Sequence, residues 1–519
     1  MEKVKKFVFI IFFQIIIVNA QNLSLYEKEN WSTPETEIDK IVFSTLKKLN
    51  IKPAYSSSDE VFIRRIYLDT IGMPPELEEV INFLNDKNPD KRKLLIDKLL
   101  ERKEFAEYWS MKWADILRIK SEFPINLWPN AVQAYHKWII DSLRKNKPYD
   151  KFVRELLTSS GSNFRVPPVN FYRAVSGRDS YSIASYVCLT FMGVRFEKLP
   201  EDVKENISKF FSRISYKKTN EWKEEIVYFV PEYKEPIETF FPDGEKVKIP
   251  PDKDPRFVFA DWLIRPENPY FSRNIVNRIW AWIFGKGIIN EVDDIRPDNL
   301  PIIPELLDYL EKQLIKSNYD LKNIYRIIFN SRTYQMSFIP KDTSPDAEKY
   351  FAFYPVRRLE AEVLLDIICK FSGNGIEYIS QIPEPYTFIP PLRRNVLLGD
   401  GSITGDFLEL FGRPPRDTGY ESERNNRINE AQIRYLLNSS DLHKRIQSSL
   451  YIKEILKETR WDKKKTIERI YLSLLSRYPA ENEIKIIEEY FKKEGISFNQ
   501  AVEDIVWAII NSKEFLYRH

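Results

Sequence analysis

Apolar residues recur at helical spacing along most of the chain, and this feature constrains the fold more than any other. A hydroxyl cap and a first-turn proline in Trp31-Ser32-Thr33-Pro34 predict the start of the first helix. Apolar residues then follow every three or four positions, at Ile38, Ile41, Val42, Leu46 and Leu49. Similar spacing predicts helices over 58–71, 90–102, 103–120, 129–145, 149–159, 269–284, 304–316 and 321–329, and helices that start at Pro255, Val356 and Asn429. The chain is therefore predicted to be mainly α-helical.

The apolar period changes only between Glu224 and Pro250, where short runs separated by Pro242-Asp243-Gly244 predict a small β-hairpin. A chain of 519 residues is too long for one hydrophobic core. We predict two helical domains joined by this hairpin, with a signal segment at 1–20, an N-terminal domain at 30–220, the hairpin linker at 221–254 and a C-terminal domain at 255–519. The stretch from Gly373 to Gly405 is a long irregular connection, typical of a functional surface or a tether.

The first twenty residues have the pattern of a secretory signal. Lys3, Lys5 and Lys6 precede an apolar run from Phe7 to Val18, and Val18-Asn19-Ala20 predicts cleavage after Ala20. The protein is thus expected to be exported, to the periplasm, the cell surface or the medium. The alternative is an uncleaved N-terminal anchor. No later stretch is apolar enough for a transmembrane anchor.

Charge, cysteine and histidine content exclude several classes of function. The 79 basic and 76 acidic residues are interspersed and give a net charge of +3, so nucleic acid is not an expected partner. Cys188 and Cys369 lie in apolar helical sequence and are expected to be buried free thiols. With only His136, His443 and His519 and no cysteine cluster, no metal site and no cofactor are predicted. A lone helical histidine is usually a surface or capping residue.

Five strings carry a family likeness: FIRRIYLDTIGMPP from Phe62, NKPYDKFVRELLTSSGSNFRVPPVNFYR from Asn146, RFVFADWLIRPENPYFSRNIVNRIWAWIFGKGII from Arg256, SRTYQMS from Ser331 and RRLEAEVLLDII from Arg357. They resemble the paired N-terminal and C-terminal domains of unknown function of planctomycete cytochrome-associated exported proteins. The resemblance spans nearly the whole chain after the signal segment. It implies export and assigns no activity.

The chain departs from the family pattern at two places. In relatives, a string like Phe191-Met192-Gly193-Val194-Arg195 is followed by the Cys-x-x-Cys-His haem motif, whereas here no cysteine or histidine precedes Phe210-Phe211. Relatives also carry Cys-x-Cys before Glu-Arg, where this chain has Tyr420-Glu421-Ser422. We expect no covalently bound haem, because thioether attachment needs two thiols and an axial histidine. Since both cysteine pairs are missing together, we hypothesise that the two segments lie near each other.

Common catalytic motifs are absent. The sequence has no Gly-x-Ser-x-Gly, no phosphate-binding glycine loop and no dinucleotide fingerprint. Carboxylate catalysis leaves no such signature, and Glu360, Glu362 and Asp366 open a predicted helix. The alternative is that acids in a first turn favour the helix dipole.

A polar set in otherwise apolar helices is the candidate ligand site. We expect Arg64, Arg65 and Asp69, with Trp113, Asp115, Arg118 and Lys120, to form a structural network, since buried Arg–carboxylate pairs hold helices in register, and the spacing of Asp115 and Arg118 permits an ion pair. The alternative is that these residues, together with Asn163, Asn170 and Arg173, line a cleft for an anionic or sugar ligand. The remaining candidate ligand residues are Arg154, Arg278, Arg413, Arg416, Glu421, Glu423 and Arg424.

The sequence thus favours an exported helical binding or assembly component without haem, whose partner is an exported protein or a polysaccharide. The alternatives are a carboxylate-dependent hydrolase of extracellular polysaccharide and a degenerate relative of electron-transfer proteins. A deep cleft with unpaired carboxylates would favour the hydrolase. Acids tied up in arginine pairs would favour the binding or assembly component.

Overall fold

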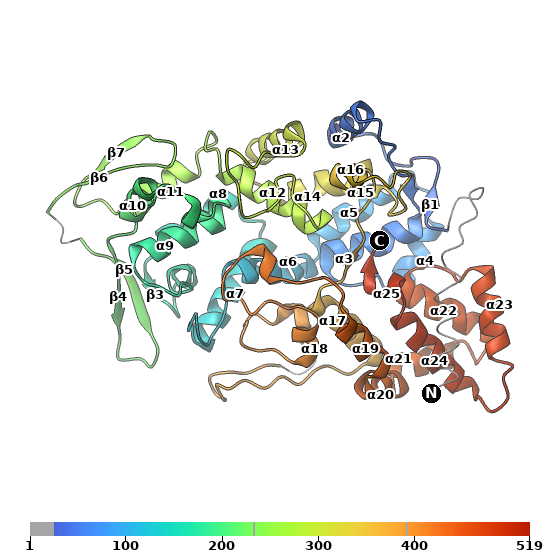
Figure 1. The fold of residues 1–519 in the computed structure, drawn as a ribbon. Coiled ribbons are helices and arrows are strands. Elements are labelled where there is room, and N and C mark those ends of the chain that lie inside the picture. The colour runs from blue at the N-terminus through green and yellow to red at the C-terminus, as the bar shows by residue number, and fades with distance from the viewer. Residues whose placement is uncertain (1–24, 232–233, 391–392) are drawn as a thin grey trace.

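The computed structural model describes residues 25–231, 234–390 and 393–519, so the predicted signal segment 1–20 lies outside the described residues. Helices make up 53% of the structure and strands 6%. The prediction of a mainly α-helical fold is confirmed. Figure 1 shows an elongated molecule, with the β4–β5 and β6–β7 hairpins at one end and the last helices at the other.

The N-terminal part, as described from residue 25 onward, is built from nine α-helices with short strands between and after them. The helices are α2 (Glu37–Lys48), α3 (Asp59–Ile71), α4 (Leu77–Asn85), α5 (Lys91–Glu101), α6 (Lys103–Ile116), α7 (Pro129–Arg144), α8 (Tyr149–Thr158), α9 (Ser180–Val187) and α10 (Glu201–Lys209). The strands are β1 (Glu27–Lys28), β2 (Ser56–Ser57), β3 (Gly161–Ser162), β4 (Ile214–Lys218), β5 (Glu225–Phe229), β6 (Ile237–Phe240) and β7 (Lys246–Ile249).

The C-terminal part is almost entirely helical. It contains α11 (Pro255–Leu263), α12 (Phe271–Phe284), α13 (Pro304–Lys316), α14 (Leu321–Phe329), α15 (Arg332–Gln335), α16 (Pro345–Lys349), α17 (Ala361–Ser372), α18 (Asp406–Leu410), α19 (Glu430–Asn438), α20 (Ser440–Ser448), α21 (Leu450–Glu458), α22 (Lys463–Leu475), α23 (Glu481–Tyr490), α24 (Phe498–Ile510) and α25 (Lys513–Leu516). Two short strands, β8 (Arg357–Arg358) and β9 (Tyr517–Arg518), complete it.

The strands between the two parts pair antiparallel. β5 lies between β3 and β4, and β6 pairs with β7 so that Phe240 faces Lys246 across the predicted Asp-Gly turn. The predicted hairpin is therefore present. β4 begins at Ile214, within the range predicted for the N-terminal domain.

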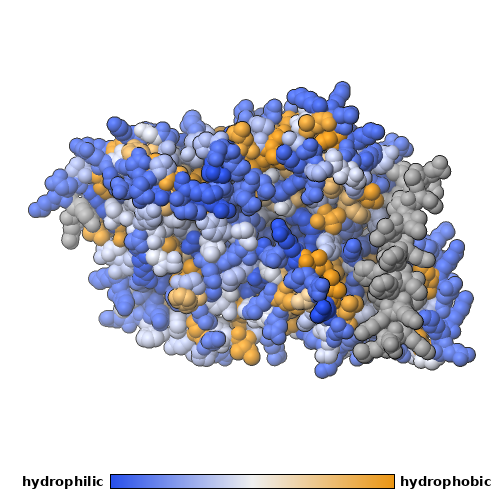
Figure 2. All heavy atoms as spheres, viewed as in Figure 1, coloured by the Kyte–Doolittle hydropathy of each residue, from blue (hydrophilic) through white to orange (hydrophobic). Residues whose placement is uncertain are grey.

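The two helical parts share one continuous buried core. α13 packs on α2, α14 packs on α5, and α17 packs near α6 through the short 3₁₀ turn at Asn395–Leu397. The apolar residues buried at these contacts belong to a single cluster that runs from Ile38 to Leu516. On the face shown in Figure 2, polar residues predominate and apolar atoms are exposed in small separate patches. None of the helices in the described ranges is both long enough and apolar enough to cross a bilayer.

Two predicted helix starts are wrong. α2 begins at Glu37 instead of near Pro34, because the backbone N–H of Thr36 donates to the Asp39 carboxylate (2.8 Å) in a capping box. The helix predicted from Val356 begins only at Ala361, because residues 357–358 form β8 and pair with β9 at the chain end. Such a long-range pairing leaves no periodic signal in the sequence.

The two cysteines are free thiols, as predicted. Cys188 is fully buried and Cys369 half-buried, and burial raises the pKa of both thiols, that of Cys369 to about 11. The expected surface position of helical histidines is wrong for His136. Its ring lies in the interior beside Ser110, with Gly399 packed against it, and burial lowers its pKa to about 3.

Candidate functional site: an ion-pair layer between the two helical parts

The start of α17 places two carboxylates in the interior. Glu362 accepts two hydrogen bonds from Arg424, at 2.7 and 2.9 Å, and Arg413 lies 3.4 Å from it. Burial acts to raise the pKa of Glu362, but these two guanidinium groups hold it at about 2. Glu362 is therefore an ionised acceptor with its charge fully matched.

Arg424 links this carboxylate to the N-terminal part. It also contacts Asp115 of α6 at 2.8 Å, and Arg416 donates to the other oxygen of Asp115 at 2.9 Å. Arg413, Arg416 and Arg424 all come from the irregular segment after α18. This segment therefore joins α6 to α17 through ion pairs.

A second group of charges surrounds Glu360, just before α17. Arg518 of β9 lies 2.6 Å from Glu360 and 3.2 Å from Asp69 of α3, and Lys112 of α6 lies 3.0 Å from Glu360. The hydroxyl of Tyr108 accepts a hydrogen bond from Arg518 at 2.9 Å. Burial opposes ionisation of Glu360, yet Arg518 and Lys112 hold its pKa well below its usual range.

We call these residues the ion-pair layer. Their side chains are at most 13% exposed, so the layer is closed to a ligand of any size. Breaking a buried ion pair of this kind destabilises the fold. Removing one partner leaves a buried charge without its counter-charge, which costs about 3–5 kcal/mol of stability. The layer contains Asp69, Lys112, Asp115, Glu360, Glu362, Arg413, Arg416, Arg424 and Arg518.

Five of the predicted ligand residues meet in this layer: Asp69, Asp115, Arg413, Arg416 and Arg424. Each has another layer residue as its partner. The predicted ion pair between Asp115 and Arg118 is absent, because α6 ends at Ile116 and Arg118 adopts a left-handed conformation with φ of 49°. Its guanidinium lies 4.1 Å from the centroid of the Tyr186 ring.

Four other predicted residues help to position the segment after α18; two of them, Glu421 and Glu423, belong to it. Lys120 pairs with Asp417 at 2.7 Å, and Glu423 accepts from the backbone N–H of Asp417 at 2.8 Å. Glu421 accepts from the indole N–H of Trp282 at 2.9 Å. Arg278 pairs at 2.7 Å with Asp293, which in turn accepts from the backbone N–H of Glu421. The acidic loop around Asp293 is thus buried and paired.

The segments around Gly193 to Arg195 and around Tyr420 to Ser422 lie against each other, as hypothesised. The guanidinium of Arg195 lies 5.5 Å from the centroid of the Tyr420 ring. The carbonyl of Gly193 accepts a hydrogen bond from the backbone N–H of Ile295, close to the acidic loop that binds Glu421. The two segments therefore adjoin, and a cation–aromatic contact joins them.

The other predicted ligand residues lie elsewhere, so the predicted set does not line one cleft. Arg64 donates to the carbonyls of Leu474 and Phe515, at 2.6 and 3.1 Å, and Arg65 to those of Tyr334, Met336 and His519. Arg154 is partly exposed and pairs with Asp261, while Trp113 packs in the aromatic core beside Phe152 and Trp282. Asn163, Asn170 and Arg173 support the β3–β5 region. Their ligand-binding role stays a prediction.

Sequence reasoning missed Lys112 and Arg518, which complete the charge balance around Glu360. Lys112 stands within an aromatic helix, and Arg518 is the penultimate residue of the chain. The signal that could have found them is the repeated occurrence of charged residues inside otherwise apolar segments, since buried charges are rare unless paired.

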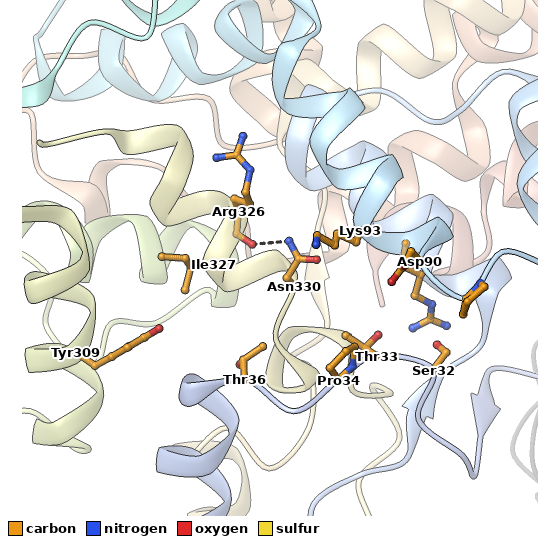
Figure 3. A pocket seen from close by; sticks show the side chains of 12 residues that line it. Ser32, Thr33, Pro34, Thr36, Asp90, Lys93, Tyr309, Arg326, Ile327 and Asn330 are labelled. Carbon is orange, nitrogen blue, oxygen red and sulfur yellow. Dashed lines mark hydrogen bonds between the residues drawn. The ribbon is translucent and has the colours of Figure 1, made fainter. Parts of the chain in front are cut away.

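A shallow cavity of about 370 Å³ lies between the N-terminal segment, the start of α5 and the helices α13 and α14 (Figure 3). Thr36, Tyr309 and Asn330 face it, and the Asn330 side chain donates to the Arg326 carbonyl at 2.9 Å. Arg326 itself pairs with Asp97. None of the predicted ligand residues lines this cavity.

Comparison with known protein families gives two matches. Residues 37–189 match the model of the PSCyt2 domain, a protein of unknown function (DUF1549), and residues 255–491 match that of the PSD1 domain, a protein of unknown function (DUF1553). No curated protein and no solved structure matches the chain. The two domain matches, in this order, show that the chain belongs to the family of proteins that pair these two domains of unknown function.

Proposed function

We propose that the protein is an exported binding or assembly component that recognises a polysaccharide or another exported protein. The signal pattern at 1–20 supports export, and both matched domains are of unknown function. Charges from α3, α6, α17 and β9 meet in the ion-pair layer and join the two helical parts.

The observation that carries this proposal is the pairing of Glu360 and Glu362 with buried cations. A glycoside hydrolase needs a carboxylic acid that is protonated at working pH and a second carboxylate across the scissile bond. The arginines hold the pKa of Glu362 at about 2, and Glu360 is held low by Arg518 and Lys112. Neither residue is a protonated acid at neutral pH.

Asp366 is the third acid of α17, and its environment differs. Burial raises its pKa to about 6, although Arg394 acts to lower it. Its carboxylate accepts from the backbone N–H and side chain of Asn395, at 2.5 and 2.8 Å, and from the backbone N–H of Val396. These bonds use the carboxylate to hold the segment 395–397 on α17, which supports a structural role.

The test is to apply residues 21–519 to immobilised polysaccharides and, separately, to an extract of exported proteins. The proposal predicts retention on at least one of these without release of reducing sugar. Release of reducing sugar that disappears in Asp366→Asn would contradict it and favour a hydrolase. N-terminal sequencing of protein recovered after secretion should begin at Gln21, and a product still starting at Met1 would contradict export with cleavage.

A further inference from the structure

Three aromatic side chains from distant parts of the sequence gather at the β4–β5 hairpin, where one lysine lies between two of them. The rings of Trp128, before α7, and Tyr386, in the loop after α17, have centroids 5.5 Å apart at an angle of 61°. The ammonium of Lys223 lies 5.0 Å from the Trp128 ring and 5.4 Å from that of Trp222. We call Trp128, Trp222, Lys223 and Tyr386 the aromatic platform.

The platform is open to solvent. Trp222 is 66% exposed and Tyr386 40% exposed, while Trp128 is half-buried. Figure 1 shows the hairpin at one end of the molecule and α7 between this hairpin and the centre, with the long loop after α17 extending toward the same end. Large exposed aromatic rings that adjoin one another are unusual on a surface that has no partner.

The backbone at Trp128 is strained in a way that positions its ring. Its φ of 73° and ψ of 145° lie in a region that glycine adopts readily and other residues rarely do. The conformation is held from both sides: the N–H of Trp128 donates to the Ser121 carbonyl, and the carbonyl of Leu127 accepts from Arg173 at 3.1 Å. Backbone strain at a half-buried tryptophan whose ring borders the surface points to a use for the indole itself.

The predicted residues Asn163 and Arg173 hold the backbone next to Lys223 and Trp128. The side chain of Asn163 donates to the carbonyl of Lys223 at 3.3 Å and accepts from the N–H of Glu225 at 2.9 Å. Arg173 pairs with Glu225 at 3.0 Å and also holds Leu127. The hairpin turn and the loop before α7 are thus fixed relative to each other, which lowers the entropy cost of binding.

Lys223 supplies an unmatched charge. The two carboxylates next to it in the turn are already paired, since Arg165 contacts both Glu221 and Glu224. Among the residues that the structure describes, no carboxylate lies within ion-pair distance of the Lys223 ammonium, which instead faces the two indole rings. A bound anionic group would complete this arrangement.

We infer that the aromatic platform binds an acidic polysaccharide. This inference rests on the proposed function and names the class of ligand. Sugar rings present apolar C–H faces that stack on indole and phenol rings, and a carboxylate on the sugar would pair with Lys223. A nucleic acid would require an extended basic groove, and a peptide would require an apolar groove or a free strand edge beside the rings. The platform offers separate rings and one cation.

The test is calorimetric titration of residues 21–519 with polygalacturonate, and with amylose as a neutral polymer. We expect polygalacturonate to bind, and Trp222→Ala and Trp128→Gly each to weaken binding at least tenfold. Lys223→Met should reduce the preference for polygalacturonate over amylose. Trp461→Ala is the matched control, because Trp461 is 57% exposed and lies between α21 and α22, away from the platform; its affinity should equal that of the unsubstituted protein.

Trp128→Gly keeps the inference testable without a folding defect, since glycine relieves the strain at position 128. Binding of polygalacturonate that survives both platform substitutions would overturn the platform and leave the proposed function intact. Absence of polygalacturonate binding by the unsubstituted protein would overturn the inference. The proposed function would fail only if the polysaccharide and exported-protein captures described above were negative as well.

Discussion

The ion-pair layer and the aromatic platform reverse the usual distribution of side chains. Inside the molecule, the layer gathers arginines and carboxylates at less than one-seventh exposure. At the surface, the platform exposes Trp222 and Tyr386. The charges inside form ion pairs within the chain, whereas the lysine between the surface rings pairs with no carboxylate among the described residues. The polar residues that stand out most in the sequence thus hold the fold together, while the surface left for a ligand is aromatic.

The largest expected effect comes from breaking the layer at Arg424. Arg424→Met removes the two hydrogen bonds that Arg424 donates to Glu362 and the ion pair between Arg424 and Asp115. We expect the free energy of unfolding to fall by about 3–5 kcal/mol, because a buried carboxylate is left unmatched. Urea denaturation followed by circular dichroism measures the change.

Arg434→Met is the matched control. Arg434 also pairs with a glutamate, Glu430, but both side chains are largely exposed. Exposed pairs contribute little, so the urea midpoint should hardly move. Equal destabilisation by the two substitutions would contradict the role given to the layer.

A smaller effect is expected at Asp366, the acid of α17 that lies outside the ion-pair layer. Its pKa is raised from 3.8 to about 6, so the folded protein binds this proton more tightly than the unfolded chain does. This proton binding contributes fully to the free energy of unfolding below pH 3.8, and the contribution is lost as the pH rises through 6. At roughly 1.4 kcal/mol per pKa unit, the contribution is about 3 kcal/mol.

Asp366→Asn should therefore flatten the dependence of stability on pH between 4 and 6. Urea midpoints measured across that range test this for both proteins. Glu362 acts in the opposite sense: its pKa is depressed to about 2, so its contribution is present above pH 4.5 and is lost as the pH falls toward 2. An unchanged slope between pH 4 and 6 in Asp366→Asn would show that the acid does not hold a proton there.

The smallest effect on stability is expected at the platform. Trp128→Gly removes a half-buried ring but relieves backbone strain of about 1–3 kcal/mol. We expect the two terms nearly to cancel, which leaves the unfolding free energy within about 1 kcal/mol of the unsubstituted value. A loss as large as that at Arg424 would mean that the ring serves the core and not a ligand.

Local signals predicted most of the fold. α13 and α14 begin and end at the residues predicted from the spacing of apolar residues. The start of α2 was misplaced because the capping box at Thr36 outweighed Pro34. β8 was missed because its partner is the end of the chain.

The candidate site could be predicted only in part, because its contacts join distant residues. Asp69 and Asp115 were identified as polar residues in apolar helices, but their partners Arg518 and Arg424 lie hundreds of positions away. The platform was missed because Trp128, Trp222 and Tyr386 stand in three unrelated turns. No spacing in the sequence brings them together.

The most direct test of the account is to measure the affinity for polygalacturonate of two variants, Arg424→Met and Trp222→Ala, at a low temperature where both are folded. Circular dichroism on the same samples verifies folding. The account predicts that Arg424→Met binds as the unsubstituted protein does, although it unfolds at lower urea, and that Trp222→Ala has at least tenfold lower affinity with unchanged stability. The reverse pattern, with binding lost in folded Arg424→Met and kept in Trp222→Ala, would contradict it.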